Sequence, residues 1–414
     1  MKKNILIFCD VFVPPAFGVR VRYFFSYFAK KGWNLTLLSE YHPEQKYIPT
    51  DFPVYIFDYY RFRNSFLFRF EWIFKVVLNL LFDARNRFFY KKSLKIIENQ
   101  HFDLVFATSS FNCCPFGAAA AIAQKMQINF VADIRDMIEQ APKNDYVVAH
   151  RPHTFLGRIF VNYYRKVNIN RRNKALKTAK NVTAVSKWHV ENLQKINPAT
   201  HLILNGFDEN LFIPAAKKTK KFTVSYFGNI YNEKLRNPEI LFIALKNLVK
   251  KNLIYPQNFI VQWFSDEKSR QIIEKFAKKF NVCNFMNYQS FIPHENLPEK
   301  MHESSIVLSL CNSKEGGVFG MMTTKFFEYI GTNRPVLCTP NNSDELAQTI
   351  STIDCGLVSS DVSEVEKFIL EKYAEWQQNG FTLGTVSAKD REKFSRKNGA
   401  EILEKLFLEI VYSL

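Results

Sequence analysis

The sequence of 414 residues lacks the short motifs by which several enzyme classes are recognised. It contains no G-x-G-x-x-G, G-x-S-x-G, H-E-x-x-H or D-x-D segment. These absences argue against the usual dinucleotide fingerprint, a serine nucleophile elbow, zinc-peptidase chemistry and a divalent cation held by paired aspartates. We therefore expect no metal ion and no cofactor.

Cysteines and long hydrophobic runs are also scarce. Of the seven cysteines only Cys113 and Cys114 are close in sequence, and no cysteine or histidine cluster has zinc spacing, so we interpret them as reduced thiols of a cytosolic protein. The uncharged window 104–124 contains Ser, Asn, Pro and Gly, which indicates strand, loop and helix instead of a membrane span. The apolar segment 5–9 is too short for the core of a signal peptide, and none is expected.

Basic residues are in excess. Lys and Arg number 56 against 39 Asp and Glu, a formal net charge of +17. Such a charge attracts nucleic acid, a membrane face or a phosphorylated small molecule. No signature of a nucleic-acid-binding domain accompanies the charge, so nucleic acid is not an expected partner and nucleic-acid binding stays a distant alternative.

The basic excess is concentrated in two segments. Between residues 61 and 92 eight basic and two acidic residues are interleaved with aromatic and aliphatic ones, and residues 146–190 contain no acid. Basic helices with aromatic faces are typical of the headgroup layer of anionic membranes, so an anionic membrane surface is an expected partner. The alternative is that the aromatics form core and the cations a solvated face.

Short apolar runs alternate with helical patterns along the chain, which predicts parallel sheets covered on both faces. Val21, Phe24, Phe25 and Phe28, for example, have the spacing of a helix stripe. A basic linker around 213–221 separates two such series. The predicted fold class is α/β, with two tandem Rossmann-like doubly wound domains at 1–214 and 215–394 and a cleft between them. A final helix within 395–414 is expected to pack back on the first domain.

Ligands of doubly wound domains sit at the carboxyl ends of the strands, so polar residues there are candidates. In the first domain, Gly18 precedes a predicted helix where backbone can approach an anion, and Arg20 and Arg22 flank it as phosphate ligands or solvated charges. Asp133, Arg135 and Asp136 lie at a strand end and either orient a sugar hydroxyl or brace a loop. Ser109 and Ser110 are candidate binding residues together with Asp133 and Arg135, and Asp136 is a candidate catalytic group.

The second domain offers more candidates. Gly228 and Asn229 follow a strand, and Lys234 and Arg236 near the next helix form a plausible diphosphate clamp or a solvated basic turn. Thr323 or Thr324 is expected to cap a helix that presents free N–H groups to a phosphate. The remaining candidates are Glu315 and Gly317 in a glycine-rich loop, and Lys325 and Glu328, which share one helix face as ribose ligands or as a surface ion pair.

In their order along the chain these segments resemble the GT-B glycosyltransferases, in particular the retaining family four. PPAFGVRVRYFFSYFAKKGWNLTLL is similar to the family's opening proline–glycine loop, helix and second strand. DIRDM resembles the D-x-R-D element of its bacterial polysaccharide members. IPHENLPEKMHESSIVLSL followed by TTKFFEYIGTNRPVL is the most specific match.

The resemblance implies an activity and roles for particular residues. It implies a retaining hexosyltransferase that moves a sugar from a nucleotide sugar, expected to be UDP-linked, to a glycan or polyprenyl-linked acceptor in bacterial surface polysaccharide synthesis. Gly18 and the pair Lys234 and Arg236 would meet the donor diphosphate, and Glu328 would bind the ribose. Where the family carries a further glutamate this chain has Gly320, so Glu315 or backbone would contact the transferred sugar.

The resemblance also leaves alternatives open. A nucleotide-sugar epimerase and a non-catalytic sugar-nucleotide-binding relative share the same fold and site. As a transferase of lipid-linked acceptors the protein would be cytoplasmic and peripheral on the inner face of the plasma membrane. The donor sugar, its base, the acceptor and the linkage cannot be read from the residues.

Overall fold

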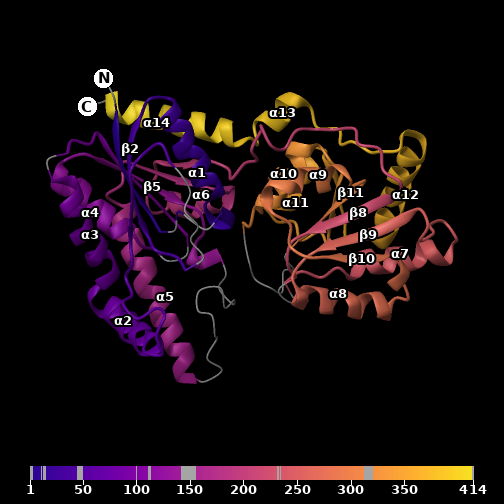
Figure 1. Ribbon diagram of the computed structural model, residues 1–414, viewed down its shortest axis with the longest axis horizontal. Coiled ribbons are helices and arrows are strands. Elements are labelled where there is room, and N and C mark those ends of the chain that lie inside the picture. The colour runs from indigo at the N-terminus through magenta and orange to yellow at the C-terminus, as the bar shows by residue number, and fades with distance from the viewer. Residues whose placement is uncertain are drawn as a thin grey trace. The chain divides into compact units, whose positions relative to one another are not determined.

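The computed structural model describes residues 3–10, 12, 15–43, 50–98, 100–110, 113–140, 155–230, 233, 235–311 and 320–412. It divides into two compact units (Figure 1): unit 1 comprises Met1–Leu204 and Gly399–Leu414, and unit 2 comprises Asn205–Asn398. Residues 205–214, which were predicted to end the first domain, belong to unit 2. The boundary between the units therefore falls earlier than the predicted one between residues 214 and 215. Within the described ranges no helix is both long and apolar enough to cross a bilayer.

Unit 1 is built on a parallel sheet of seven strands in the order β3-β2-β1-β4-β5-β6-β7. The strands are β1 (Asn4–Cys9), β2 (Asn34–Glu40), β3 (Val54–Phe57), β4 (Leu104–Ser109), β5 (Asn129–Ile134), β6 (Asn181–Ala184) and β7 (Thr200–Leu202). The helices are α1 (Pro15–Lys30), α2 (Phe68–Phe82), α3 (Ala84–Ile97), α4 (Phe116–Met126), α5 (Phe155–Leu176), α6 (Lys187–Gln194) and α14 (Arg396–Tyr412, in unit 1 from Gly399 onward), with a 3₁₀ turn η1 (Ile138–Gln140).

The apolar runs form strands because both faces of this sheet are covered. Along β1, Leu6 and Phe8 join one buried cluster, which includes residues of α3 and α4, whereas Ile5 and Ile7 join another, which includes residues of α1 and α14. A strand buried on both faces reads as a continuous apolar run, as the sequence predicted. The four residues of the predicted α1 stripe are all buried, which confirms that part of the prediction.

Helix α14 packs against the α1 side of this sheet. Phe407 is fully buried, with its ring 5.4 Å from that of Phe28 and 5.3 Å from that of Phe106. Glu404 accepts hydrogen bonds from the Tyr27 hydroxyl at 3.1 Å and the Trp33 indole N–H at 3.0 Å. The C-terminal helix is therefore part of the core of unit 1.

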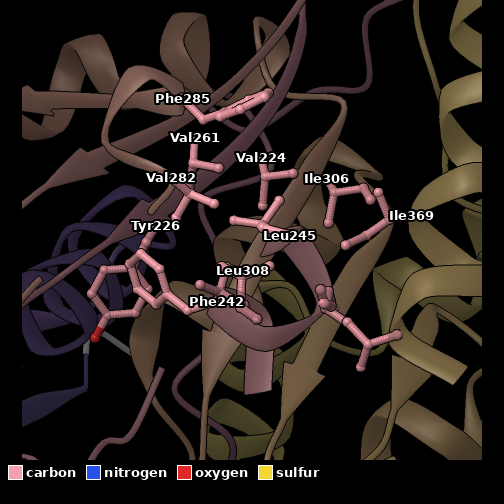
Figure 2. Packing of buried hydrophobic residues seen from close by; sticks show 14 of the residues in the cluster. Val224, Tyr226, Phe242, Leu245, Val261, Val282, Phe285, Ile306, Leu308 and Ile369 are labelled. Carbon is pink, nitrogen blue, oxygen red and sulfur yellow. The ribbon is translucent and has the colours of Figure 1, made fainter. Parts of the chain in front are cut away.

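Unit 2 contains a parallel sheet of six strands in the order β10-β9-β8-β11-β12-β13. The strands are β8 (Phe222–Phe227), β9 (Phe259–Phe264), β10 (Met286–Gln289), β11 (Ile306–Leu310), β12 (Val336–Thr339) and β13 (Gly356–Val358). The helices are α7 (Glu239–Lys250), α8 (Glu267–Lys279), α9 (Leu297–His302), α10 (Thr324–Thr332), α11 (Glu345–Thr352), α12 (Val362–Asn379) and α13 (Ala388–Glu392), with 3₁₀ turns η3 (Cys283–Phe285) and η4 (His294–Asn296). Figure 2 shows Val224, Tyr226 and Leu308 of the strands together with Phe242 and Leu245 of α7 in the core of this unit.

The strand order of each sheet has a reversal point, where successive βα connections leave in opposite directions. It lies between β1 and β4 in unit 1 and between β8 and β11 in unit 2. Ligands of doubly wound sheets bind outside the carboxyl ends of the strands at this point. The two α/β doubly wound sheets confirm the predicted fold class, and the reversal points mark where each unit should bind its ligand.

The burial of α14 leads to a stability prediction. Replacing Phe407 by Ala should lower the free energy of unfolding of unit 1 by about 3–5 kcal/mol, because a fully buried phenylalanine leaves a cavity. Urea unfolding followed by fluorescence measures the change. The matched control is Ile402→Ala in the same helix, where the side chain is 43% exposed, and a change within about 0.5 kcal/mol is expected. Equal effects of both substitutions would show that α14 is not part of the core.

Candidate functional site

A cavity of about 240 Å³ lies at the carboxyl ends of β8 and β11 in unit 2, at the reversal point of the sheet. Its lining comes from the ends of β8, β9 and β11, from the segment before α9 and from the start of α10. Four residues predicted as site residues line it: Gly228, Asn229, Arg236 and Lys325. Segments separated by about a hundred residues of sequence thus converge on one cavity, as the doubly wound topology requires.

Arg236 is held at the cavity by the loop that follows β8. Its Nη1 donates to the Asn229 carbonyl at 2.8 Å and to the Tyr226 hydroxyl at 3.4 Å. Gly228 has a φ of +150°, a backbone conformation that side chains rarely adopt, and its N–H donates to the Phe264 carbonyl at 3.0 Å. Glycine is therefore required here by the turn, which brings the Asn229 carbonyl to the guanidinium.

The other walls of the cavity are aromatic and aliphatic. The rings of Phe227 and Phe264 stack with centroids 4.7 Å apart and an interplanar angle of 3°. Phe291 also lines the cavity although its side chain is 81% exposed. The sequence analysis missed these residues, since apolar residues at strand ends look like ordinary core; the Phe291–Ile292 pair before the short helix was the available signal.

The cavity also receives the N-terminus of α10. Thr323 occupies the position before the helix in extended conformation, but its side chain makes no capping hydrogen bond. Thr323 thus occupies the predicted N-cap position without a side-chain cap, and the amides at the start of α10 are left without that side-chain acceptor. Thr323 and Lys325 line the cavity, on either side of the predicted Thr324. A helix N-terminus with an adjacent lysine favours an anion.

Glu328 is fully buried beneath this helix terminus and is not part of the cavity lining. Its carboxylate accepts from Lys325 Nζ at 2.9 Å and lies 3.1 Å from His294 Nε2. Burial alone would raise the pKa of Glu328, but the His294 hydrogen bond and the Lys325 charge outweigh burial, so its pKa is lowered. The ribose contact expected of Glu328 stays a prediction. In this structure the residue fixes Lys325, and sequence spacing gave no sign of His294.

Three predicted donor ligands lie outside the described residues: Lys234, Glu315 and Gly317. Gly320, at the position where the resembling family has a glutamate, has a φ of +60°, and its N–H donates to Asp344 at 3.3 Å.

In unit 1 a polar cluster lies at the carboxyl ends of β1, β4 and β5, again at the reversal point. Asp10 is its centre: its carboxylate accepts from Ser110 through both the backbone N–H and the hydroxyl at 2.9 Å, and from Arg135. Ser109 donates mainly to the Cys114 carbonyl at 2.7 Å. The structure thus brings together the predicted Ser109, Ser110 and Arg135, around an aspartate that the sequence analysis did not single out although it directly follows the first strand.

Asp136 lies beside this cluster and has a pKa raised above the ordinary value of a carboxyl. It is partly exposed, and burial, helped by the charge of Asp10 and opposed by that of Arg135, raises the pKa of Asp136 to about 6. A carboxylate with a pKa near neutral is suited to proton transfer.

Asp133 and Gly18 support the fold of unit 1. Asp133 is 1% exposed and accepts from Arg20 at 2.7 Å, Thr108 at 2.8 Å and Thr183 at 2.7 Å, so the expected acceptor contact is not supported. Arg20, expected as a phosphate ligand or a solvated charge, is buried in this ion pair and is neither. Gly18 lies inside α1, where a Cβ would approach the Phe12 carbonyl oxygen to 2.4 Å. The glycine therefore allows the backbone of α1 to pack closely against Phe12.

Metal ligands are not clustered in the part of the chain that the structure describes: no group of three or more His, Cys, Asp or Glu side chains is placed to hold an ion.

Comparison with known proteins identifies the fold. No protein-family model matches the sequence, and no curated protein matches it. Sucrose-phosphate synthase from Thermosynechococcus elongatus superposes with a TM-score of 0.63 at 14% identity, covering 100% of both chains. Anabaena HepE, solved with UDP, gives 0.61 at 13% identity, covering 99% of this chain and 100% of its own. A Listeria monocytogenes protein described as a UDP-N-acetylglucosamine 2-epimerase gives 0.56 at 10% identity, covering 99% and 96%. The chain therefore has the fold of the GT-B glycosyltransferases.

The perturbed carboxyl of Asp136 leads to a pH-dependent prediction. Because its folded pKa lies above the unfolded value, ionised Asp136 destabilises the fold above pH 6, and this cost disappears as the pH falls towards 4. Asp136→Asn should therefore raise the free energy of unfolding at pH 7.5, with a gain that shrinks below pH 6. Urea unfolding of both proteins across this range measures the gain, and a pH-independent difference would contradict the assigned pKa.

Proposed function

We propose that the protein is a retaining glycosyltransferase, of the hexosyltransferase type, that uses a UDP-linked sugar and a glycan or polyprenyl-linked acceptor. Its role would be in bacterial surface polysaccharide synthesis, on the inner face of the plasma membrane. The observation that carries the proposal is the cavity of unit 2, where Arg236, Lys325 and the N-terminus of α10 converge at the reversal point of the sheet. The neighbour HepE has been solved with UDP and with UDP-glucose, which supports a uridine nucleotide as donor.

The chemistry of this cavity suits a diphosphate. Arginine binds phosphate oxygens through a planar fork, lysine adds a point charge, and helix amides donate hydrogen bonds. Arg236 and Lys325 are both fixed by protein contacts before ligand arrives. The aromatic walls leave an apolar surface for the rest of the nucleotide. Lys234, Glu315 and Gly317 remain predicted donor contacts.

In the proposed reaction the bond between the anomeric carbon and the diphosphate oxygen breaks, and the acceptor oxygen bonds to that carbon on the same face. The acceptor proton passes to the leaving diphosphate. Negative charge then develops on the diphosphate, where Arg236 and Lys325 stabilise it without having to reorganise. Since these cations supply the required charge, we expect activity without an added divalent cation and full activity in the presence of a chelator.

The acceptor is assigned to the cluster of unit 1. The Ser110 hydroxyl and the Arg135 guanidinium can bind sugar hydroxyls, and Asp136, ionised above pH 6, can accept a hydrogen bond from the reacting one. Asp10 holds Ser110 and Arg135 in place and is a positioning residue.

A nucleotide-sugar epimerase is the second candidate, favoured by the likeness to the Listeria protein. A non-catalytic sugar-nucleotide-binding protein is the third, made plausible by Gly320 at the position of the family's glutamate. Incubation with labelled sugar nucleotides distinguishes the three candidates. Transfer of the sugar to an acceptor identifies a transferase, and a changed sugar still attached to the nucleotide identifies an epimerase. Binding without any product identifies a non-catalytic protein.

The donor is tested by a thermal-shift screen of UDP, GDP, CMP and dTDP sugars. A ligand that binds only the folded state raises the melting temperature by mass action, so a UDP sugar should give the largest shift. If no sugar nucleotide shifts the melting temperature at millimolar concentration, the proposed function fails.

Replacing Arg236, the guanidinium at the proposed diphosphate site, should abolish most of the transferase activity. Arg236→Ala is expected to lower kcat/KM by about 10²-fold or more, roughly 2.7 kcal/mol of transition-state stabilisation, because the developing diphosphate charge loses a bidentate partner. Arg270→Ala is the matched control, since Arg270 belongs to unit 2 and is paired with Glu274 on the surface of α8. Activity of the Arg236 variant within threefold of the control would remove Arg236 from the site.

A further inference from the structure

Helix α2 is oriented opposite to an ordinary surface helix. Two of its three charged residues, Glu71 and Lys75, face the protein with side chains 7% and 17% exposed and form an ion pair at 2.9 Å. The third, Arg69, is exposed. Glu71 also accepts from the backbone N–H groups of Arg61 and Phe62 at 2.8 Å. A surface helix usually turns its apolar stripe to the core and its charges to solvent. Here the polar contacts anchor the helix, and the apolar stripe is left outside.

The outward face of α2 carries large apolar side chains at helical spacing. Phe70 is 67% exposed, Phe74 61% and Leu81 60%. The full exposed set in and just before this helix is Phe66, Leu67, Phe70, Trp72, Ile73, Phe74, Val77, Leu81 and Phe82. In contrast, Phe89 of α3 is fully buried, so the alternative that the aromatics of the segment 61–92 form core holds for Phe89 and not for the exposed rings of α2.

The first turns of α5 show the same pattern. Phe155 is 71% exposed, Leu156 76% and Ile159 51%, and the set is completed by Phe160 and Tyr163. Helices α2 and α5 both belong to unit 1 (Figure 1), and hydrogen bonds from the Arg171 guanidinium of α5 to the carbonyls of Asn79 and Leu80 join α5 to the end of α2. We call the exposed apolar residues of α2 and α5, together with Phe66 and Leu67, the α2–α5 face.

The exposed charges within helices α2 and α5 have one sign. Arg61, Arg69, Arg158 and Lys166 are exposed within or beside the α2–α5 face. Helix α5 contains no acidic residue, and the one acid of α2, Glu71, is turned inward and paired. Two copies of this chain meeting through the face would bring the cations of these helices against one another, and neither helix has an exposed acid to compensate. The charge thus disfavours self-association and favours an anionic partner.

From this combination we infer that the α2–α5 face docks on the surface of an anionic lipid bilayer. Phenylalanine, leucine and tryptophan side chains enter the boundary between headgroups and acyl chains, and the flanking cations lie near the lipid phosphates. The helices lie in the plane of the interface. This inference does not depend on the proposed reaction, because lipid binding requires no nucleotide sugar.

Flotation of the full-length protein with vesicles tests the inference. Binding is expected to vesicles of phosphatidylcholine mixed with phosphatidylglycerol and to be about tenfold or more weaker for phosphatidylcholine alone, since each cation near an anionic surface contributes to binding. Raising the salt concentration should weaken the binding to anionic vesicles.

Two double variants separate the contribution of the apolar side chains to vesicle binding from that of the charges. Phe70→Ser with Phe74→Ser removes two exposed rings, and Arg69→Glu with Arg158→Glu reverses two exposed charges; each should lower the partition coefficient about tenfold or more. Neither pair is part of the core, so the folds should persist and nucleotide binding should be unchanged. The controls are Ile213→Ser, which removes an apolar side chain that is 56% exposed in unit 2, and Lys268→Glu, which reverses an exposed charge there.

Four outcomes would overturn the inference. Equal recovery with neutral and anionic vesicles would refute the role of charge, and no recovery with either would refute docking altogether. If sedimentation velocity shows dimers that Phe70→Ser with Phe74→Ser abolishes, while vesicles are not bound, the face joins two copies of the chain. Loss of vesicle binding in the control variants to the same extent would show that the effect is not specific to the α2–α5 face.

Discussion

The proposed activity depends on two cations held at the carboxyl ends of parallel strands before any ligand binds. Arg236 is fixed by the Asn229 carbonyl and Lys325 by buried Glu328. Glu328 in turn lies against His294, so a carboxylate that never reaches the cavity sets the position of a charge that does. Stabilisation of a developing anion is strongest when its partners need no reorganisation, and this arrangement provides that condition.

Unit 1 repeats the topology with another chemistry. At its reversal point an aspartate, Asp10, gathers the Ser110 amide and hydroxyl and the Arg135 guanidinium, and Asp136 stands beside them with a raised pKa. One sheet therefore offers cations to an anion, and the other offers hydroxyl, guanidinium and carboxylate groups suited to a sugar. In the proposed reaction the cluster of cations would be the donor site and the cluster around Asp10 the acceptor site.

Much of the fold was predictable because strands buried on both faces leave continuous apolar runs, and the stripe of α1 leaves its own spacing. What the sequence could not reveal are the partners that tertiary structure supplies. Gly18 was expected in a loop and lies in a helix; Glu328 was expected at a ribose and is turned to His294. The apolar stripe of α2 was visible as a pattern, but periodicity does not tell whether a stripe faces the core or the solvent.

The most direct test of the central claim is calorimetric titration of the protein with UDP and with UMP, in wild type and in the Arg236→Ala variant. If the cavity of unit 2 binds a diphosphate, wild type should bind UDP about tenfold or more tightly than UMP. The reason is that charge-assisted hydrogen bonds to the second phosphate are among the strongest available. The preference should largely disappear in the variant. Equal affinity of wild type for UDP and UMP would contradict the account.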